Sequence, residues 1–264
     1  MKTARASLAA LLVILLAAVL TVEASPRLSD AQAAQIIDSL AATHPVAAAD
    51  LLSTGWRHAD AVSVLETHAD TTDAGVLWRL ARSRIDIGEA MEDQDAAEPQ
   101  YELAIDEANR ILTVNENEPE AHIRIATASG RVALLKGPFS AAGLVKDTYR
   151  HAHLAAAEAD SMPVAYYILG RTHRTLMAKS GLARRLAGLT FASDDSIAFY
   201  FKKALHVANG KMIQARVEYA DYLIEQGILQ DEARAQLDAA LELPLRDEHD
   251  EAAQEKARKL LTKL

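Results

Sequence analysis

Histidine and acidic residues are the side chains of this sequence that could carry catalysis, and their spacing gives little support for an active site. His151 and His153 are two positions apart, which places them on different faces of a helix. His122 and His173 fall at positions expected to pack between helices. The sequence contains no G-x-S-x-G, no phosphate-binding glycine loop and no H-E-x-x-H. We therefore expect no catalytic residues and no enzyme activity.

The acidic residues are concentrated between positions 86 and 120, where twelve carboxylates accompany one basic residue, Arg110. Asp93 and Asp95 have the opening spacing of an EF-hand calcium loop, but Glu98 occupies the position that requires glycine. The run is interpreted as a solvated face and loop, with weak divalent-cation binding as the alternative. We expect no defined metal site and no cofactor.

Residues 161–193 have the opposite charge pattern, because they contain no Asp or Glu. Their basic residues are Arg171, Arg174, Lys179, Arg184 and Arg185. The planar guanidinium of arginine suits carboxylate and phosphate groups. In a chain with a net charge of −9, such a segment indicates anion binding. The alternative is that these arginines pair with carboxylates of adjacent helices.

The elements that must position these residues are helices. Apolar residues make up 50% of the 264 positions, alanine is abundant, and aromatic residues are only 5%. No period-two strand pattern is present. The chain has no cysteine, which excludes disulfides and thiolate metal sites. Its overall acidity argues against nucleic acid as a partner.

Small residues recur within helical patterns at Ala81, Ala126, Gly170 and Ala220, where a second helix can lie close against the first. This pattern resembles the first helix of a tetratricopeptide repeat. It predicts an all-α, tetratricopeptide-like superhelix, a right-handed solenoid of helix pairs. The expected domain covers residues 30–264, with four helix pairs in residues 73–244 and a capping helix at 247–264.

First helices line the concave surface of such a superhelix, and counting along them predicts a ligand-binding groove. Its residues are Trp78, Arg82, Ile123, Thr127, Tyr167, Arg171 and Arg174. Two connections are longer than the minimum: an acidic loop at 89–99, before a second helix that starts at Gln100, and an insertion at 181–193. Within the insertion, Arg184, Arg185 and Phe191 are candidate contacts for a membrane or an anion.

The N-terminus has the pattern of a secretory signal peptide over residues 1–24. Lys2 and Arg5 precede an apolar run at 8–20, and Val22-Glu23-Ala24 offers a cleavage site before Ser25. The run would span roughly 20 Å as a helix, against a hydrocarbon core of ~30 Å. Export to a periplasmic or secreted location is therefore expected. The alternative is an uncleaved membrane anchor.

Four segments in this order resemble the regulator of microtubule dynamics family. They are LWRLARS at 77–83, NEN at 115–117 followed by Ala121-His122, AYYILG at 165–170, and RRLA at 184–187 leading to Phe191. The resemblance implies tetratricopeptide-like repeats. It also implies microtubule association in animal members, and phospholipid binding between organelle membranes in one branch.

Together these features predict a non-enzymatic binding or scaffold protein whose concave groove holds a protein or peptide partner with anionic groups. The alternative is a phospholipid-binding or lipid-transfer protein acting at a membrane surface. In a eukaryotic setting, microtubule association would be expected instead.

Overall fold

A computed structural model describes residues 27–246 and 248–264, and every element in these ranges is a helix. The helices are α2 (Asp30–Leu40), α3 (Pro45–Thr54), α4 (His58–His68), α5 (Ala74–Ala90), α6 (Gln94–Leu112), α7 (Pro119–Leu135), α8 (Pro138–Glu158), α9 (Pro163–Met177), α10 (Gly181–Leu186), α11 (Asp194–Val207), α12 (Ile213–Gln226), α13 (Gln230–Glu242) and α14 (Asp250–Leu261). The expected signal peptide lies outside the described residues, so it stays a prediction.

Local sequence signals explain where several helices begin and end. Ser29 and Gln32 form a capping box at the start of α2, and the side chain of Asp73 accepts the backbone N–H of Val76 at the start of α5. Proline opens α7 and α9, where its missing N–H leaves no hydrogen bond unmade. Gly227 ends α12 in the left-handed conformation, with φ of 65°.

Four helix pairs form the centre of the molecule: α5 with α6, α7 with α8, α9 with α11, and α12 with α13. The small residues that recur through the sequence lie buried inside these pairs. A Cβ atom at Gly88 would meet the ring of Tyr101 at 2.7 Å, and one at Gly170 would meet the ring of Phe201 at 3.1 Å. Glycine at these positions lets a large aromatic ring pack directly on the helix backbone.

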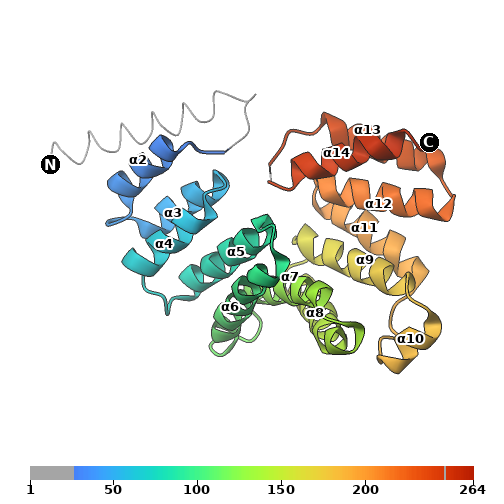
Figure 1. Ribbon diagram of the computed structural model, residues 1–264, viewed down its shortest axis with the longest axis horizontal. Helices are drawn as coiled ribbons and strands as arrows, with labels where there is room; N and C mark the ends of the chain where they lie inside the picture. The colour runs from blue at the N-terminus through green and yellow to red at the C-terminus, as the bar shows by residue number, and fades with distance from the viewer. Residues whose placement is uncertain (1–26, 247) are drawn as a thin grey trace.

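The pairs follow one another around an arc, with α2–α4 on one side of its opening and α13–α14 on the other (Figure 1). This arrangement confirms the predicted all-α solenoid. Helix α14 covers the last pair with Ala257 and Leu260. The amide of Gln254 donates to the carbonyls of Ala240 and Leu243, at 3.0 and 2.9 Å, which satisfies backbone groups at the end of α13.

The start of α6 was predicted wrongly. Helix α6 begins at Gln94 and not at Gln100, because Asp93 caps it by accepting the N–H groups of Asp95 and Ala96. Pro99 therefore lies inside the helix, on a solvent-exposed turn where water can hydrate the unbonded carbonyl of Asp95. The insertion at 181–193 contains the short helix α10, held in place by Leu189 and Ala192 packing against Leu176.

In residues 27–246 and 248–264, no helix combines the length and the apolar character needed to cross a membrane.

Candidate binding groove

The concave face of the arc contains a cavity of about 1020 Å³. Helices α5, α7, α8 and α9, the segment 183–189, the start of α12 and the loop before α14 all contribute to its lining. Its walls are mainly apolar, and include Val145, Val164, Ile168, Leu176 and Leu189. A cavity of this size and character can enclose a ligand of considerable length.

Basic side chains outnumber acidic ones around this cavity, although the protein as a whole is acidic. The basic residues are Arg124, Arg131, Lys136, Arg171, Lys179, Arg184, Lys211 and Arg246, and the acidic residues are Asp86, Glu89 and Asp250. A concave basic surface attracts anions and raises their local concentration. The charge pattern of the groove is thus opposite to the net charge of −9.

Half of these basic side chains are held by neighbours within the protein. Arg124 pairs with Glu120 at 2.7 Å, while Arg131 pairs with Glu89 and Lys136 with Glu98. Arg184 donates to the sulfur of Met177 and to the carbonyl of Ala192. In the described part of the chain, no carboxylate forms an ion pair with the other four, which are Arg171, Lys179, Lys211 and Arg246.

Arg171 is positioned by the tyrosine one turn before it on α9. Its guanidinium lies 5.6 Å from the ring centroid of Tyr167, within cation–π distance. Burial raises the pKa of Tyr167, so the phenol stays neutral near pH 7. The pair therefore presents a fixed, positively charged guanidinium beside an aromatic face on the groove wall.

A sequence model of the family described as Regulator of microtubule dynamics protein 1-3 matches residues 46–264. The chain belongs to the regulator of microtubule dynamics family. The crystal structure of a thermophilic tetratricopeptide-repeat protein from Thermus thermophilus superposes with a TM-score of 0.59 and 16% identity, over 83% of this chain and 97% of that one. This likeness supports the fold. No match was found among curated proteins. Family and fold are those of a helical-repeat interaction scaffold, a class that is typically not enzymatic.

The structure places three of the predicted groove residues on the cavity wall of this regulator of microtubule dynamics member: Thr127, Tyr167 and Arg171. Their binding role stays a prediction. Arg124, Thr127 and Arg131 of α7 line the cavity, and their spacing of three and four residues places them on one face of the helix. Ile123 does not line the cavity, because it is 1% exposed and packs with Ala155 and Ala165.

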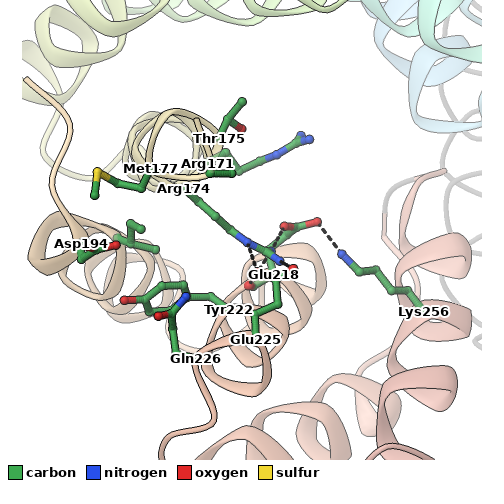
Figure 2. Close-up of a pocket in the computed structure, with 12 residues that line it drawn as sticks. Arg171, Arg174, Thr175, Met177, Asp194, Glu218, Tyr222, Glu225, Gln226 and Lys256 are labelled. Atoms are coloured by element: carbon green, nitrogen blue, oxygen red, sulfur yellow. Dashed lines mark hydrogen bonds and ion pairs between the residues drawn. The ribbon is translucent and has the colours of Figure 1, made fainter. Parts of the chain in front are cut away.

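Arg174 points out of the main groove into a smaller pocket of about 320 Å³ between α9 and α12 (Figure 2). There it pairs with Glu218 at 2.6 Å, Asp221 at 2.9 Å and Glu225 at 2.7 Å. Lys256 of α14 pairs with two of these carboxylates, Glu218 and Asp221. Arg174 therefore pairs with carboxylates of an adjacent helix, which was the alternative to anion binding. Arg171 points away from these three carboxylates (Figure 2).

Trp78 and Arg82 do not line the cavity. Trp78 packs beside Leu77 and Ala108, with the guanidinium of Arg79 4.2 Å from its ring centroid and that of Arg82 5.3 Å away. Arg82 also lies 3.5 Å from Asp50. These two residues are joined to each other and to the N-terminal helices.

The insertion divides its three predicted contact residues between different environments. Arg184 lines the groove, and Arg185 is exposed on α10. Phe191 is stacked on Tyr149, with ring centroids 3.9 Å apart, so it anchors the insertion to the repeats. The exposed apolar residues of α10 are instead Leu182 and Leu186, at 68% and 72% exposure, which the sequence analysis did not identify.

Proposed function

We propose that this protein is a non-enzymatic scaffold that binds an acidic segment of a protein partner in its concave groove. The observation that supports this proposal is a largely apolar cavity with four basic side chains that are not matched by carboxylates. Apolar walls would accept the hydrophobic side chains of an extended peptide. The unpaired cations, with Arg171 beside Tyr167 at the centre, would bind its carboxylates.

The test compares peptide binding by the full chain and by charge variants. A labelled library of acidic peptides containing apolar residues is titrated by fluorescence anisotropy against wild type, Arg171→Ala and Lys211→Ala. A hydrogen bond to a charged group contributes ~1.5–3 kcal/mol, so each substitution is expected to weaken binding by that amount. Added salt is also expected to weaken it, because the groove is open to water.

Arg234 provides the matched control. It is exposed on α13, does not line the cavity, and its replacement by alanine changes the net charge by the same amount. Equal peptide affinity for wild type, Arg171→Ala and Lys211→Ala would contradict the proposal. Equal weakening in Arg234→Ala would show that only the net charge matters.

A second candidate function is phospholipid binding at a membrane surface, and helix α10 favours it. Leu182 and Leu186 are exposed beside Arg185, while the neighbouring Ala183, Arg184 and Ala187 line the cavity. In this arrangement α10 would rest on the membrane and the apolar walls would hold acyl chains. Cosedimentation with phosphatidylcholine vesicles containing phosphatidic acid tests it. Loss of vesicle binding in Leu182→Ser/Leu186→Ser, with peptide binding intact, would separate the two functions.

A further inference from the structure

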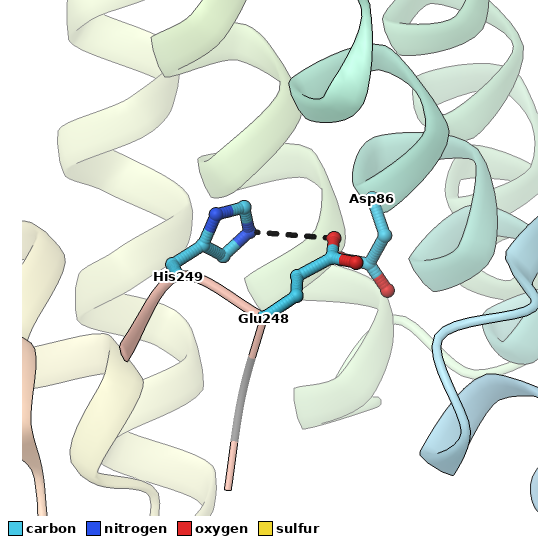
Figure 3. A group of neighbouring side chains, drawn as sticks. All are labelled: Asp86, Glu248 and His249. Atoms are coloured by element: carbon cyan, nitrogen blue, oxygen red, sulfur yellow. Dashed lines mark ion pairs between the residues drawn. The ribbon is translucent and has the colours of Figure 1, made fainter. Parts of the chain in front are cut away.

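A cluster of imidazole and carboxylate groups lies where the loop before α14 meets α5, at one margin of the groove. Asp86 comes from α5, and Glu248 and His249 come from the loop (Figure 3). One potential ligand atom from each residue lies within 4.8 Å of the other two. Asp86 is remote in sequence from Glu248 and His249, so no spacing motif could have revealed the cluster.

A fourth side chain points into the same cluster from α4. His58 is only 10% exposed, and its Nε2 lies 3.2 Å from the Oε2 of Glu248. Its Nδ1 lies 3.3 Å from the Oδ2 of Asp86, but the angle does not allow a hydrogen bond. The Oε1 of Glu248 is also buried without a hydrogen bond. Two polar atoms in and beside the cluster, the Nδ1 of His58 and the Oε1 of Glu248, are therefore buried without a hydrogen bond, which is uncommon in folded proteins.

Carboxylates and basic groups both surround this point. Burial raises the pKa of Asp86 to about 6; His58 and Arg124 oppose this increase, and Glu89 and Glu248 add to it. Nearby, Glu89 holds the Nε2 of His249 at 2.5 Å and pairs with Arg131, which orients the imidazole ring. The same nitrogen lies 3.7 Å from the Oε1 of Glu248, so a metal ion bound there would replace the contact with Glu89.

We propose that Asp86, Glu248 and His249 bind a divalent first-row transition-metal ion, with His58 as the fourth ligand. Imidazole nitrogens and carboxylate oxygens, without thiolate, suit Zn²⁺ and its neighbours in the series. The ion would join α4 and α5 to the loop before α14, and would thereby hold together parts of the arc that are remote in sequence. Its role is structural, as four protein ligands leave no open position for substrate.

Zn²⁺ binding to the full chain tests the proposal. Protein freed of metal with a chelator is titrated with Zn²⁺ by calorimetry, and thermal unfolding is followed with and without the ion. We expect about one strongly bound ion per chain. At a free Zn²⁺ concentration about a hundredfold above Kd, the midpoint should rise on the order of 5–10 °C.

Matched variants assign the ligands. Glu248→Gln and His249→Ala should lose the strong site and the rise in midpoint. His68→Ala and Glu251→Gln should retain both, because these residues are exposed and outside the cluster. If Glu248→Gln does not fold, Asp86→Asn gives the same comparison from the other side of the site. Absence of strong Zn²⁺, Co²⁺ or Mn²⁺ binding to wild type would overturn the proposal, as would unchanged binding in His249→Ala.

Discussion

The Nδ1 of His151 donates a hydrogen bond to the Nδ1 of His122, 2.9 Å away between α8 and α7. The direction follows from Arg150, whose guanidinium lies 2.9 Å from the Nε2 of His151 and can only donate. That nitrogen must therefore accept, which leaves the proton of the neutral ring on Nδ1. Both imidazoles are almost fully buried, and this arrangement requires both to be neutral.

The histidine pair should make the protein less stable in mild acid. Burial and the charge of Arg150 lower the pKa of His151 to about 4, from an ordinary value of 6.5. Between these values the unfolded chain binds a proton that the folded chain does not. The free energy of unfolding should therefore fall as pH decreases from about 6.5 to about 4. Urea unfolding at several pH values measures this.

His151→Gln isolates the contribution of the pair, because glutamine does not titrate. Its unfolding free energy should depend less on pH than that of wild type, while the exposed-residue control His68→Gln should behave as wild type does. Asp86 acts in the opposite direction, since its pKa of about 6 in the folded protein exceeds the ordinary 3.8. Because wild type and His151→Gln both contain Asp86, the comparison between them cancels its contribution to the pH dependence. Parallel pH profiles for wild type and His151→Gln would contradict the prediction.

The contact between Gly88 and Tyr101 predicts opposite effects for two glycine-to-alanine changes. An added Cβ at Gly88 must displace a buried ring, which should cost ~1–3 kcal/mol. At Gly143, also inside a helix, a Cβ meets nothing within 4 Å, so alanine should stabilise by about 0.5–1 kcal/mol. Denaturant unfolding checks both values. Stabilisation by Gly88→Ala would contradict the packing described here.

Gly170→Leu should be more damaging than Gly88→Ala, because a larger side chain must be accommodated against Phe201, which is fully buried. The expected loss is ~1–3 kcal/mol or more. The thermal midpoint measures it, with Gly143→Leu as the matched control on an exposed helix face. An unchanged midpoint in Gly170→Leu would show that the second helix is not packed closely at this position.

Arg174→Ala should reduce stability while leaving groove binding unchanged. The side chain is 16% exposed and pairs with three carboxylates of α12, so its removal should cost ~1–3 kcal/mol. The control measures the loss of an exposed ion pair, that of Arg150 with Asp147, by comparing Arg150→Ala/His151→Gln with His151→Gln alone. Because both side chains of this pair are largely exposed, its loss should change the free energy of unfolding by only about 0–1 kcal/mol. Thermal unfolding and peptide titration decide the matter. If Arg174→Ala keeps the stability of wild type but binds peptide more weakly, the prediction is contradicted and Arg174 is a ligand-binding residue.

The N-terminal sequence gives a prediction independent of the fold. Protein made in a secretion-competent host should begin at Ser25, since Val22 and Ala24 offer the small or compact residues that signal cleavage requires. N-terminal sequencing of the exported protein measures the site directly. Retention of Met1, with the protein in the membrane fraction, would favour the uncleaved anchor.

The sequence was sufficient to predict the helix pairs, because small residues and apolar faces recur with helical spacing. It was insufficient where tertiary contacts select among helix faces. Arg171 and Arg174 are three residues apart and both suited to one groove, but α12 provides three carboxylates that hold Arg174 elsewhere. Pro99 favours a helix boundary in the sequence, whereas Asp93 supplies a stronger start signal six residues earlier. The cluster around Asp86 depends on the curvature of the whole arc.

The hydrogen bond between His58 and Glu248 spans 190 residues, whereas the helices themselves pack against close neighbours along the chain. Closing so long a segment carries an entropic penalty that the shorter contacts between successive repeats avoid. Repeats can therefore assemble from neighbour to neighbour before this contact forms. It should be among the last contacts made during folding and among the first to open. Amide hydrogens near Glu248 should then exchange with solvent faster than those of α7 and α9.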